Sequence, residues 1–411
     1  MFIYNLIYSL IFPIIFFRSI FKSIFSGEKL SRNLEKLALS KKSKKSNKII
    51  MIHAVSVGEV LASRKLIEEI KCKFEDYEVL ITCTTQTGSK TIKQIYGSSV
   101  SHQYLPFDHK FFVKKFIAYW QPEITFILET EVWPNLIDVL VKNGKKVFLV
   151  NARMSKKSFK RYKLFLPLLG KVFSKIDFVV CQSLKDQERF INLGVDKKNI
   201  NWDYSFKFDS LSILRSESQG KLIKNDNYKI IICASTHDPE EDILIEAFKS
   251  LKEQKIILVI APRHPERINK ILKNIKKFNL EVSLFSKNNF LLDFSKKINL
   301  IDEIGYLENL FSVANIAFIG GSLIPHGGQN FLEAVRYSLP ISSGSSTFNF
   351  QEISNDLIKN NILKIGNSSK DLRSIWESQL KMDPSQIKKI SEDYLNSKKG
   401  ASKRVLDILP I

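Results

Sequence analysis

The sequence predicts two α/β domains, each built on a parallel sheet with helices on both faces. From residue 49 onward, short apolar runs alternate with stretches of helical periodicity. A polar gap at about 209–227 interrupts this alternation, which then starts again. The length of 411 residues exceeds one ordinary domain and fits two.

The apolar runs predict buried strands, and the amphipathic stretches between them, such as 59–74 and 184–193, predict helices. In an open parallel sheet, ligands bind beyond the carboxyl ends of the strands. We therefore look for functional residues directly after each run. The runs are 48–55, 78–84, 123–128, 145–152 and 177–181 in the first half, and 228–235, 255–262, 281–286 and 315–321 in the second.

The composition excludes several classes of protein. Hydrophobic residues make up 44% and charged residues 26% of the chain, which supports a large core and argues against general disorder. The four cysteines form no CxxC pair, which argues against a disulfide scaffold and a thiolate zinc site and fits a reducing compartment. None of the six histidines forms an HxxxH pair. We therefore expect no catalytic metal.

The chain is strongly basic, with 63 Lys and Arg against 42 Asp and Glu and a net charge of +21. A field of this size favours anionic partners such as nucleic acid, an acidic membrane surface or a phosphorylated substrate. The lysines are spread over the whole chain, so compositional drift explains the charge equally well. The charge alone does not identify a partner.

The first 25 residues are candidates for a membrane anchor. Residues 2–17 carry no charge, and the segment reaches 25 if Arg18 and Lys22 extend toward the membrane surface. The positive residues on its C-terminal side would place the body of the protein in the cytoplasm. A crossing helix, an interfacial helix and a helix docked on the protein's own core all remain open. The basic stretch 41–48 would be a solvated linker near anionic headgroups.

In the first half, carboxylates follow two of the predicted strands. Ser56-x-x-Glu59 has the spacing of a helix capping box. Glu59 is also placed to act as a general base that takes a proton from an alcohol acceptor. After a later strand come Glu129 and Glu131, which either complement a helix start or steady positive charge on a sugar. Arg153, after the next strand, either binds an anion or is an ordinary surface residue.

The second half holds three candidate anion sites. Residues 235–237 and 262–267 each follow a strand, and the second of these offers Arg263, Arg267 and a histidine to a phosphate. The glycine-rich turns within 320–330 precede a helix predicted near Phe331, where backbone N–H groups and the helix dipole would favour a phosphate. Plain capping and ligand-free turns are the structural alternatives. Neither a GxGxxG nor a P-loop motif follows these strands, so a dehydrogenase or a P-loop ATPase is not supported.

From the residues alone, these patterns predict a membrane-attached protein of two α/β domains. A carboxylate base would lie on the first domain, and a nucleotide or phosphate would bind the second. This combination indicates group transfer from a nucleotide donor.

A set of short motifs occurs in order along the chain. The motifs are HAVSVGE (53–59), TTQTG (84–88), YLPFD (104–108), ETEVWPN (129–135), NARMS (151–155), KFD (207–209), STH (235–237), PRHPER (262–267) and GGS…GGQN…E (320–333). Together they resemble the Kdo transferases, the 3-deoxy-D-manno-octulosonic acid transferases of lipopolysaccharide synthesis. The resemblance runs from about residue 49 to about 355.

The resemblance implies a GT-B fold: two Rossmann-like parallel-sheet domains facing a central cleft, with an N-terminal membrane-anchor helix. We expect a membrane anchor at 1–25, an acceptor domain at 26–215 and a donor domain at 216–385. A C-terminal helix at 386–411 would be able to pack back on the acceptor domain.

The resemblance also implies the chemistry. The donor would be CMP-Kdo, and the acceptor the lipid A precursor (lipid IVA) at the cytoplasmic face of the inner membrane, with no metal, cofactor or nucleic acid. The anionic membrane surface and the phosphorylated acceptor would both meet the basic chain.

The family's functional residues match positions in both halves of this sequence. Glu59 would be the general base, and Glu129 and Lys207 would stabilise the transition state. In the family Gln329 is usually His, Ala334 is usually Pro, and Gly-Asn is usual before Lys207, where residues 203–206 here read DYSF. The positions that match the CMP contacts are Pro262, Arg263, Gly305, Tyr306, Leu307, Asn330, Phe331, Leu332 and Glu333.

Three other functions are open on the sequence. A GT-B transferase that uses a UDP-sugar would share the fold. A nucleic-acid-binding protein would need basic and aromatic residues on one face, and no such motif is evident. A membrane scaffold without catalysis would not need Glu59, Lys207 and Arg263, which are all present.

Overall fold

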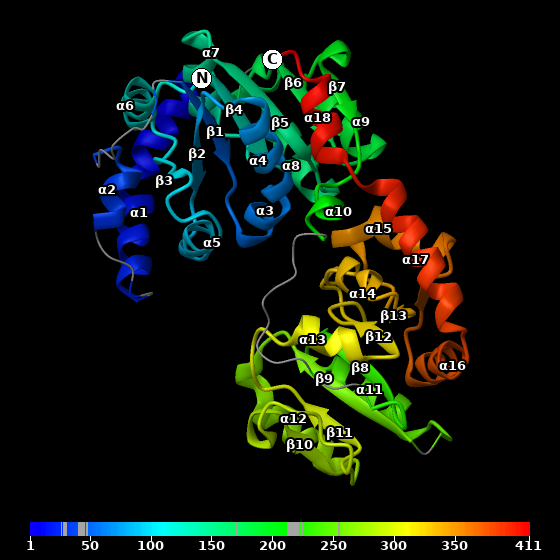
Figure 1. Ribbon diagram of the computed structural model, residues 1–411. Coiled ribbons are helices and arrows are strands. Elements are labelled where there is room, and N and C mark those ends of the chain that lie inside the picture. The colour runs from blue at the N-terminus through cyan, green and yellow to red at the C-terminus, as the bar shows by residue number, and fades with distance from the viewer. Residues whose placement is uncertain are drawn as a thin grey trace. The chain divides into compact units, whose positions relative to one another are not determined.

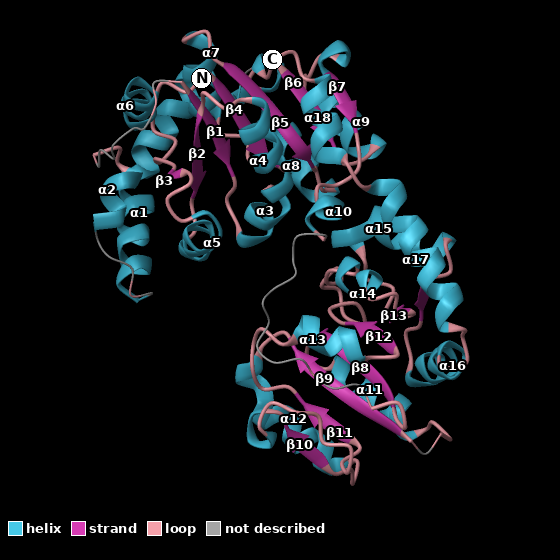
Figure 2. Ribbon diagram, viewed as in Figure 1, coloured by secondary structure: helices cyan, strands magenta, loops and turns pink. Residues whose placement is uncertain are grey.

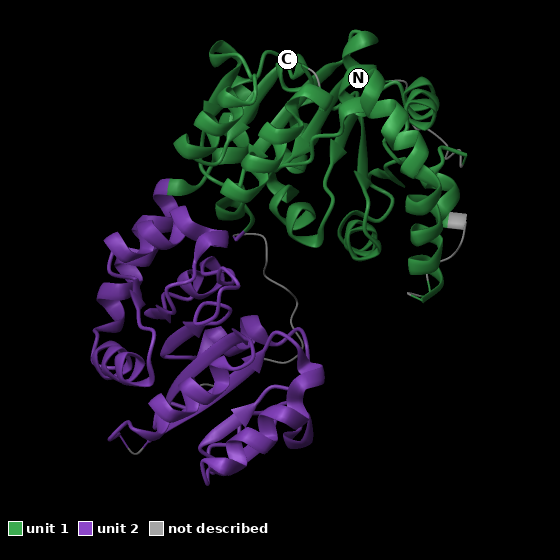
Figure 3. Ribbon diagram, turned by 180° about the vertical axis from the view of Figure 1, so that it is seen from behind, with its two compact units in different colours: residues 1–210, 398–411 green, residues 211–397 purple. Residues whose placement is uncertain are grey.

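The computed structural model describes residues 1–25, 27, 31–39, 46, 48–169, 171–211, 222, 225–253 and 255–411. The chain forms two compact units, residues 1–210 with 398–411 and residues 211–397 (Figure 3). Each unit holds one sheet flanked by helices (Figures 1 and 2). Most of the predicted linkers at 41–48 and 210–226 lie outside the described residues.

Unit 1 contains a seven-stranded sheet in the order β3-β2-β1-β4-β5-β6-β7 with parallel pairing throughout. The order reverses between β1 and β4. The strands are β1 Ile49–His53, β2 Glu78–Cys83, β3 Ser101–Tyr104, β4 Ile124–Leu128, β5 Lys146–Ala152, β6 Phe178–Cys181 and β7 Ile200–Trp202.

Helices cover both faces of this sheet because successive strand residues point to opposite sides. Met51 packs with the core on the side of α6 and α7, whereas Ile50 and Ile52 pack with the core beneath α3, α4, α5 and α18. The helices of unit 1 are α1 Phe2–Phe25, α2 Ser31–Lys36, α3 Val57–Ala62, α4 Arg64–Lys73, α5 Gln86–Tyr96, α6 Lys110–Trp120, α7 Pro134–Lys142, α8 Lys156–Leu169, α9 Leu184–Asn192, α10 Lys207–Ser210 and α18 Ala401–Ile408.

Unit 2 repeats the plan with the order β10-β11-β9-β8-β12-β13-β14, again with parallel pairing, and reverses between β8 and β12. Its strands are β8 Lys229–Thr236, β9 Ile256–Pro262, β10 Val282–Leu284, β11 Ile298–Leu300, β12 Ile316–Ile319, β13 Ile341–Ser343 and β14 Leu363–Ile365. Its helices are α11 Glu240–Lys249, α12 Ile268–Lys277, α13 Leu307–Val313, α14 Leu332–Arg336, α15 Gln351–Lys359, α16 Ser369–Gln379 and α17 Pro384–Lys398.

The predicted fold class of two parallel-sheet α/β domains is confirmed, and each apolar run predicted as a strand contains one. Some elements differ from their predictions. The stretch 59–74 is divided at Ser63 into α3 and α4, and 386–411 is divided into α17 and α18 before Ala401. Ser63 donates its N–H to Glu59 O at the end of α3 and precedes the first residue of α4. Gly400 has a left-handed φ of 85°, which glycine adopts without strain.

The last helix, α18 (red in Figure 1), packs on α4 and α10 of unit 1. A buried carboxylate joins it to α10. Asp209 accepts hydrogen bonds from the N–H groups of Gly400 at 2.6 Å and Ser402 at 2.7 Å. These are free N–H groups at the start of a helix, so Asp209 caps α18 from another part of the chain.

We predict that Asp209→Ala lowers the free energy of unfolding by about 2 kcal/mol, because two N–H groups beside the buried carboxylate lose their acceptor. Urea denaturation of the purified protein measures this. Asp407→Ala is the control, since Asp407 lies on the exposed side of α18 and should change stability by less than about 0.5 kcal/mol. Equal midpoints for the two variants would show that the cap does not hold this segment.

Candidate active site

The candidate catalytic residues of unit 1 lie where the strand order reverses. Glu59 follows β1, and Glu129 follows β4, the two strands between which the order changes direction. Loops that leave the carboxyl ends of these strands diverge to opposite faces of the sheet and leave room for a ligand. Glu129 has a left-handed φ of 56°, an uncommon conformation for a residue other than glycine, held in part by its N–H bond to Val150 O at 3.2 Å.

Glu59 is buried and hydrogen-bonded to its own loop. Its carboxylate accepts the Val55 N–H at 2.8 Å and the Ser56 hydroxyl at 2.8 Å. The Ser56 oxygen in turn accepts the Glu59 N–H at 3.3 Å. The capping contact predicted from the Ser-x-x-Glu spacing is therefore present. It also orients the carboxylate, so capping and proton transfer do not exclude each other.

The surroundings of Glu59 suit a base that works near neutral pH. Burial raises the pKa of Glu59 to about 7, and the negative charges of Glu129 and, more weakly, Glu131 raise it too, whereas the bonds from Val55 and Ser56 lower it. A carboxyl group with a pKa near the working pH can both accept and release a proton.

Lys207 supplies a positive charge to the same cluster. It opens α10, which packs against α3. Burial lowers the pKa of Lys207, while the charges of Glu129 and Glu59 raise it. The structure therefore brings the three predicted catalytic residues of unit 1 together, although they are far apart in the sequence.

Asn151 positions the segment before Lys207. Its Oδ1 accepts the Phe206 N–H at 3.1 Å, and its own φ is 51°. Arg153, two residues further on, accepts the hydroxyl of Thr130 on its carbonyl oxygen and adds positive charge near Lys207. The NARMS motif thus connects the loops after β4, β5 and β7.

Two other motifs form hydrogen bonds that hold a loop or a helix start in place. Thr85 of TTQTG donates its hydroxyl to Val55 O at 2.7 Å and accepts the Gly88 N–H at 3.2 Å. A Cβ on Gly88 would lie 2.8 Å from Thr85 Oγ1 and 3.1 Å from Val55 O, so a larger residue would disturb this close approach. Asp108 of YLPFD accepts the N–H groups of Asn135 at 3.0 Å and Leu136 at 2.9 Å and so caps α7.

His53 is not a candidate acid or base. It is buried at the end of β1, and burial lowers the pKa of His53 to about 3. Its Nδ1 lies 2.9 Å from the Thr82 hydroxyl, and its ring meets the Trp133 ring edge-on at 6.0 Å. His53 therefore stays neutral at physiological pH and supports Trp133 of the ETEVWPN motif.

In unit 2 the corresponding loops follow β8 and β12, and a residue that the sequence analysis did not single out joins them. Glu240 is fully buried at the start of α11. Its carboxylate accepts four N–H groups, from His237 at 2.8 Å, Gly321 at 2.7 Å, Ser322 at 2.9 Å and Leu323 at 2.9 Å. The acidic helix start after 235–237 was the only signal for this residue.

Glu240 changes the interpretation of the first glycine turn. The sequence left both a phosphate site and a ligand-free turn open for residues 320–322. The N–H groups of Gly321 and Ser322 donate to Glu240, and that of Gly320 donates to Ala234 O. The structure therefore favours the ligand-free turn here, because the protein's own carboxylate takes the place of the anion. A Cβ on Gly320 would lie 2.5 Å from Ser235 O, which explains the glycine by close packing.

The contribution of the helix dipole to anion binding is also smaller than the sequence predicted. α14 has only five residues, so its dipole is short. Phe331 and Leu332 are fully buried, so neither side chain is exposed to a ligand. Asn330 Nδ2 donates to Glu333 at 3.0 Å, and Asn330 Oδ1 accepts the Leu332 N–H at 3.2 Å.

Arg263 is the arginine with an exposed side chain at the end of β9. Burial raises the pKa of Glu333, and the positive charge of Arg263 lowers it. Arg267 is held instead by a two-pronged pair with buried Glu241, with both N–O distances at 3.1 Å. Of the two arginines expected to bind phosphate, Arg267 is therefore structural.

Pro262 is buried at the end of β9, and residues 305–307 lie just before and at the start of α13. Gly305 has a φ of 102°, a conformation that favours glycine. The Tyr306 ring stacks on Phe290 at 5.4 Å with an interplanar angle of 8°. Every donor-side residue predicted from the resemblance thus lies in unit 2, around the loops after β9, β11 and β12.

Three histidines gather beside this region. The His237 ring lies 4.4 Å from His326 and 5.6 Å from His264. Burial lowers the pKa of His237 to about 4, and the charges of its neighbours, including Arg263, lower it further. His326 was not singled out in the sequence because it lies in a loop with no helical or strand period. His237 is therefore neutral near physiological pH, and an anion beside its ring would raise its pKa.

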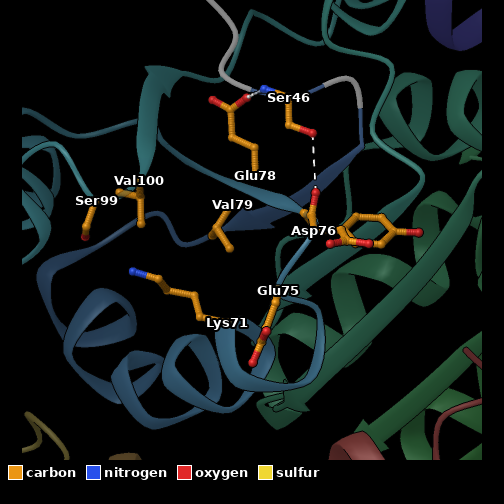
Figure 4. Close-up of a pocket in the computed structure, with 9 residues that line it drawn as sticks. Ser46, Lys71, Glu75, Asp76, Glu78, Val79, Ser99 and Val100 are labelled. Carbon is orange, nitrogen blue, oxygen red and sulfur yellow. Dashed lines mark hydrogen bonds between the residues drawn. The ribbon is translucent and has the colours of Figure 1, made fainter.

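A hollow on unit 1 lies at the amino ends of β2 and β3, away from the carboxyl ends that carry the site (Figure 4). There Glu78 accepts the Ser46 N–H at 2.9 Å. We assign it no role in the site. Within the described ranges, no group of three or more His, Cys, Asp or Glu side chains is arranged to hold a metal ion.

Comparisons with solved structures define the class of fold. A glycosyltransferase from Rickettsia africae matches with a TM-score of 0.60 and 14% identity, covering 89% of this chain and 98% of that one. UDP-GlcNAc 2-epimerase from Neisseria meningitidis matches with a TM-score of 0.59 and 12% identity, covering 88% and 98%. These likenesses, with the two parallel sheets, give the chain the two-domain GT-B fold.

The sequence comparisons give the family. The family model described as 3-deoxy-D-manno-octulosonic-acid transferase (kdotransferase) matches residues 31–210. The 3-deoxy-D-manno-octulosonic acid transferase of Haemophilus influenzae is 33% identical over 368 residues, covering 88% of this chain and 86% of that protein. The transferase of Rickettsia prowazekii is 34% identical and covers 88% and 78%. The chain belongs to the Kdo transferase family and is a glycosyltransferase.

We predict that Glu240→Gln loosens the Gly321–Leu323 turn, because an amide NH₂ would then face N–H donors that now share a carboxylate. Hydrogen exchange at the amides of Gly321, Ser322 and Leu323 should become at least about tenfold faster. Glu246→Gln on the exposed side of α11 should leave these rates unchanged. Unchanged rates in the Glu240 variant would contradict its role in holding the turn.

Proposed function

We propose that this protein transfers Kdo from CMP-Kdo to a sugar hydroxyl of the lipid A precursor (lipid IVA) in lipopolysaccharide biosynthesis. Membership of the Kdo transferase family supports the sugar and the reaction. One structural observation carries the mechanism: a buried glutamate with a pKa near 7 lies where the strand order reverses and is coupled to a second carboxylate and a lysine.

In the proposed reaction, Glu59 accepts the proton of the acceptor hydroxyl as its oxygen bonds to the anomeric carbon of Kdo. The bond from that carbon to the CMP phosphate oxygen breaks, and CMP leaves with the electron pair. Glu129 stabilises the positive charge that develops on the sugar. Lys207 offsets the two carboxylates and so allows Glu59 to be ionised when the acceptor binds.

The donor is proposed to bind unit 2, within the donor domain that we place at 216–385. Arg263 would pair with the phosphate, and Asn330 and Glu333 would bind hydroxyl groups of the ribose or the sugar. Pro262, residues 305–307 and the backbone of 331–332 would complete the contacts. The acceptor is proposed to bind the domain at 26–215, at the cytoplasmic face of the inner membrane.

Membrane association rests on α1. It is the one helix in the described part of the chain that is long and apolar enough to cross a membrane by length and composition. The chain's net charge of +21 would favour anionic headgroups and a phosphorylated acceptor.

We predict that Glu59→Gln abolishes Kdo transfer and leaves nucleotide binding unchanged. Glutamine can keep both contacts of the carboxylate, by accepting from Val55 N–H and donating to the Ser56 oxygen, but it cannot take a proton. For the wild type, kcat/KM should fall about tenfold per pH unit below pH 7, because protonation of Glu59 removes the base. Mass spectrometry of the lipid product measures transfer.

Glu68→Gln, on the neighbouring helix α4, is the matched control and should retain full activity. Loss of CMP binding in the Glu59 variant would mean that its role is structural. A pH profile that stays flat from pH 8 to pH 5 would contradict the assignment of Glu59 as the base.

We predict that CMP raises the melting temperature of the protein more than UDP does. Thermal unfolding with each nucleotide measures this.

We also predict that Arg263→Ala weakens CMP binding by roughly 10- to 150-fold, because one charge-assisted hydrogen bond is lost. Calorimetric titration measures the affinity. Arg373→Ala, in α16 of the same unit, removes an arginine paired with Glu377 and should leave the affinity unchanged. Stronger protection by UDP would favour a UDP-sugar transferase instead.

A further inference from the structure

Helix α1 is attached to unit 1 along its whole length. One stripe of its surface points toward the unit, formed by Tyr4, Tyr8, Phe12, Phe16, Ser19 and Ser23, whose spacing of three and four residues follows one side of a helix. Figure 1 shows α1 (dark blue) running along the side of unit 1. Contacts of this stripe occur at both ends of the helix and in its middle.

Polar side chains fix the two ends. Near the start, Tyr4 donates its hydroxyl to buried Asp108 at 2.8 Å, the same carboxylate that caps α7. Near the end, Ser23 is buried and accepts a hydrogen bond from Asn33 Nδ2 at 3.1 Å. Ser19 also donates to Asn33 Oδ1 at 3.2 Å. Lifting α1 from the unit would leave Asp108 and Asn33 without these partners.

Aromatic rings hold the middle. The ring of Phe12 lies 5.6 Å from Phe107 and 5.3 Å from Phe112 of α6, and Phe16 lies 6.4 Å from Phe107. Such ring contacts belong to a packed interface. α1 is therefore part of the folded unit and not a tether that begins before it.

The other side of α1 is apolar and uncovered. Eleven large apolar side chains on this helix are exposed. A spacing of three or four residues places six of them along one side of the helix: Ile3, Ile7, Leu10, Ile14, Phe17 and Phe21. A soluble protein rarely leaves an apolar strip of this length in water. Arg18 and Lys22, the two charged residues on α1, are exposed at its C-terminal end, where long side chains reach past an apolar layer.

The elements beside this strip continue its character. On α6, exposed Phe111 lies next to Phe112, which contacts α1. On α8, which packs against α1, Leu164 and Phe165 are exposed. Together α1, α6 and α8 carry ten Lys and Arg residues and no Asp or Glu. An apolar strip bordered only by positive charge is complementary to an anionic lipid surface.

We propose that α1 lies in the plane of an anionic bilayer surface without crossing it, and that α6 and α8 join it as one membrane-binding face of unit 1. This rests on the membrane location proposed above and specifies its form. A crossing helix would have to give up the Tyr4 and Ser23 bonds together with the ring contacts between them. An interfacial helix keeps all of them and covers only the outer strip.

The topology test uses the full chain with an epitope and a protease site added before Met1. In inverted inner-membrane vesicles from the expression host, the cytoplasmic face is outside. We expect added protease to remove the epitope without detergent. Removal only after detergent would show that α1 crosses the membrane and would overturn the proposal while leaving the proposed function intact.

The surface test uses Leu10→Glu combined with Ile14→Glu, which places two charges on the outer strip. We expect binding to vesicles of phosphatidylglycerol and phosphatidylcholine to weaken at least about tenfold, with the melting temperature and CMP binding unchanged. Ile358→Glu combined with Ile408→Glu, at exposed apolar positions elsewhere, should bind as the wild type does.

The remaining outcomes separate the hypotheses. Wild-type vesicle binding in the α1 variant would overturn the proposal, as would a dimer in light scattering that this variant abolishes, because a second copy would then cover the strip. Loss of membrane binding alongside normal Kdo transfer to acceptor in detergent micelles would confirm the face and leave the chemistry standing. A wild-type protein that transfers Kdo but never binds vesicles would overturn only the membrane proposal.

Discussion

The loops of both units depend on a buried glutamate that takes backbone N–H groups at the start of the helix after the unit's first strand. Glu59 follows β1 and accepts the Val55 N–H, and Glu240 occupies the related place after β8 and accepts the His237 N–H. Burying a carboxylate is costly unless such bonds satisfy it. The number of bonds differs between the two residues, and this difference separates a structural glutamate from one that is suited to chemistry.

Glu240 accepts four N–H groups and has little remaining capacity, so it behaves as an internal anion that shapes the loop after β12. Glu59 accepts one N–H and one hydroxyl, lies near the negative charge of Glu129, and has its pKa raised to about 7. The same fold position therefore holds a carboxylate satisfied by four N–H groups in one unit and, in the other, the carboxylate that we propose as the proton acceptor. Lys207 moderates the charge around the second of these.

Helix α1 likewise combines two properties. Its apolar composition suits a membrane, yet Tyr4 and Ser23 on this helix form hydrogen bonds with Asp108 and Asn33 of the same unit. Asp108 illustrates how the two are connected, since one carboxylate caps α7 and holds the N-terminal end of α1. A lipid-facing surface that is part of the folded unit would keep the acceptor-side residues at a fixed height above the bilayer, whereas a flexible tether would not.

The sequence by itself determined the α/β class and the division into two halves. It also located the main strands, because apolar runs that alternate with stretches of helical periodicity are a strong signal for a buried parallel sheet. It failed to find β3, Ser101–Tyr104, which reads SHQY, and β11, Ile298–Leu300, which reads INL, because polar residues in both strands leave no apolar run to stand out. It also indicated Glu59, Glu129 and Lys207, through the family motifs.

Only the tertiary structure decided what each of these polar groups binds. Glu240, His326 and the inner stripe of α1 gain their meaning from partners distant in the chain, and local spacing says nothing about such partners. For the same reason Arg263 and Arg267 look alike in PRHPER but differ in the fold, where Glu241 is in reach of the second and holds it. Hydrogen bonds and burial are properties of neighbours in space, and the order of residues constrains them only through the fold.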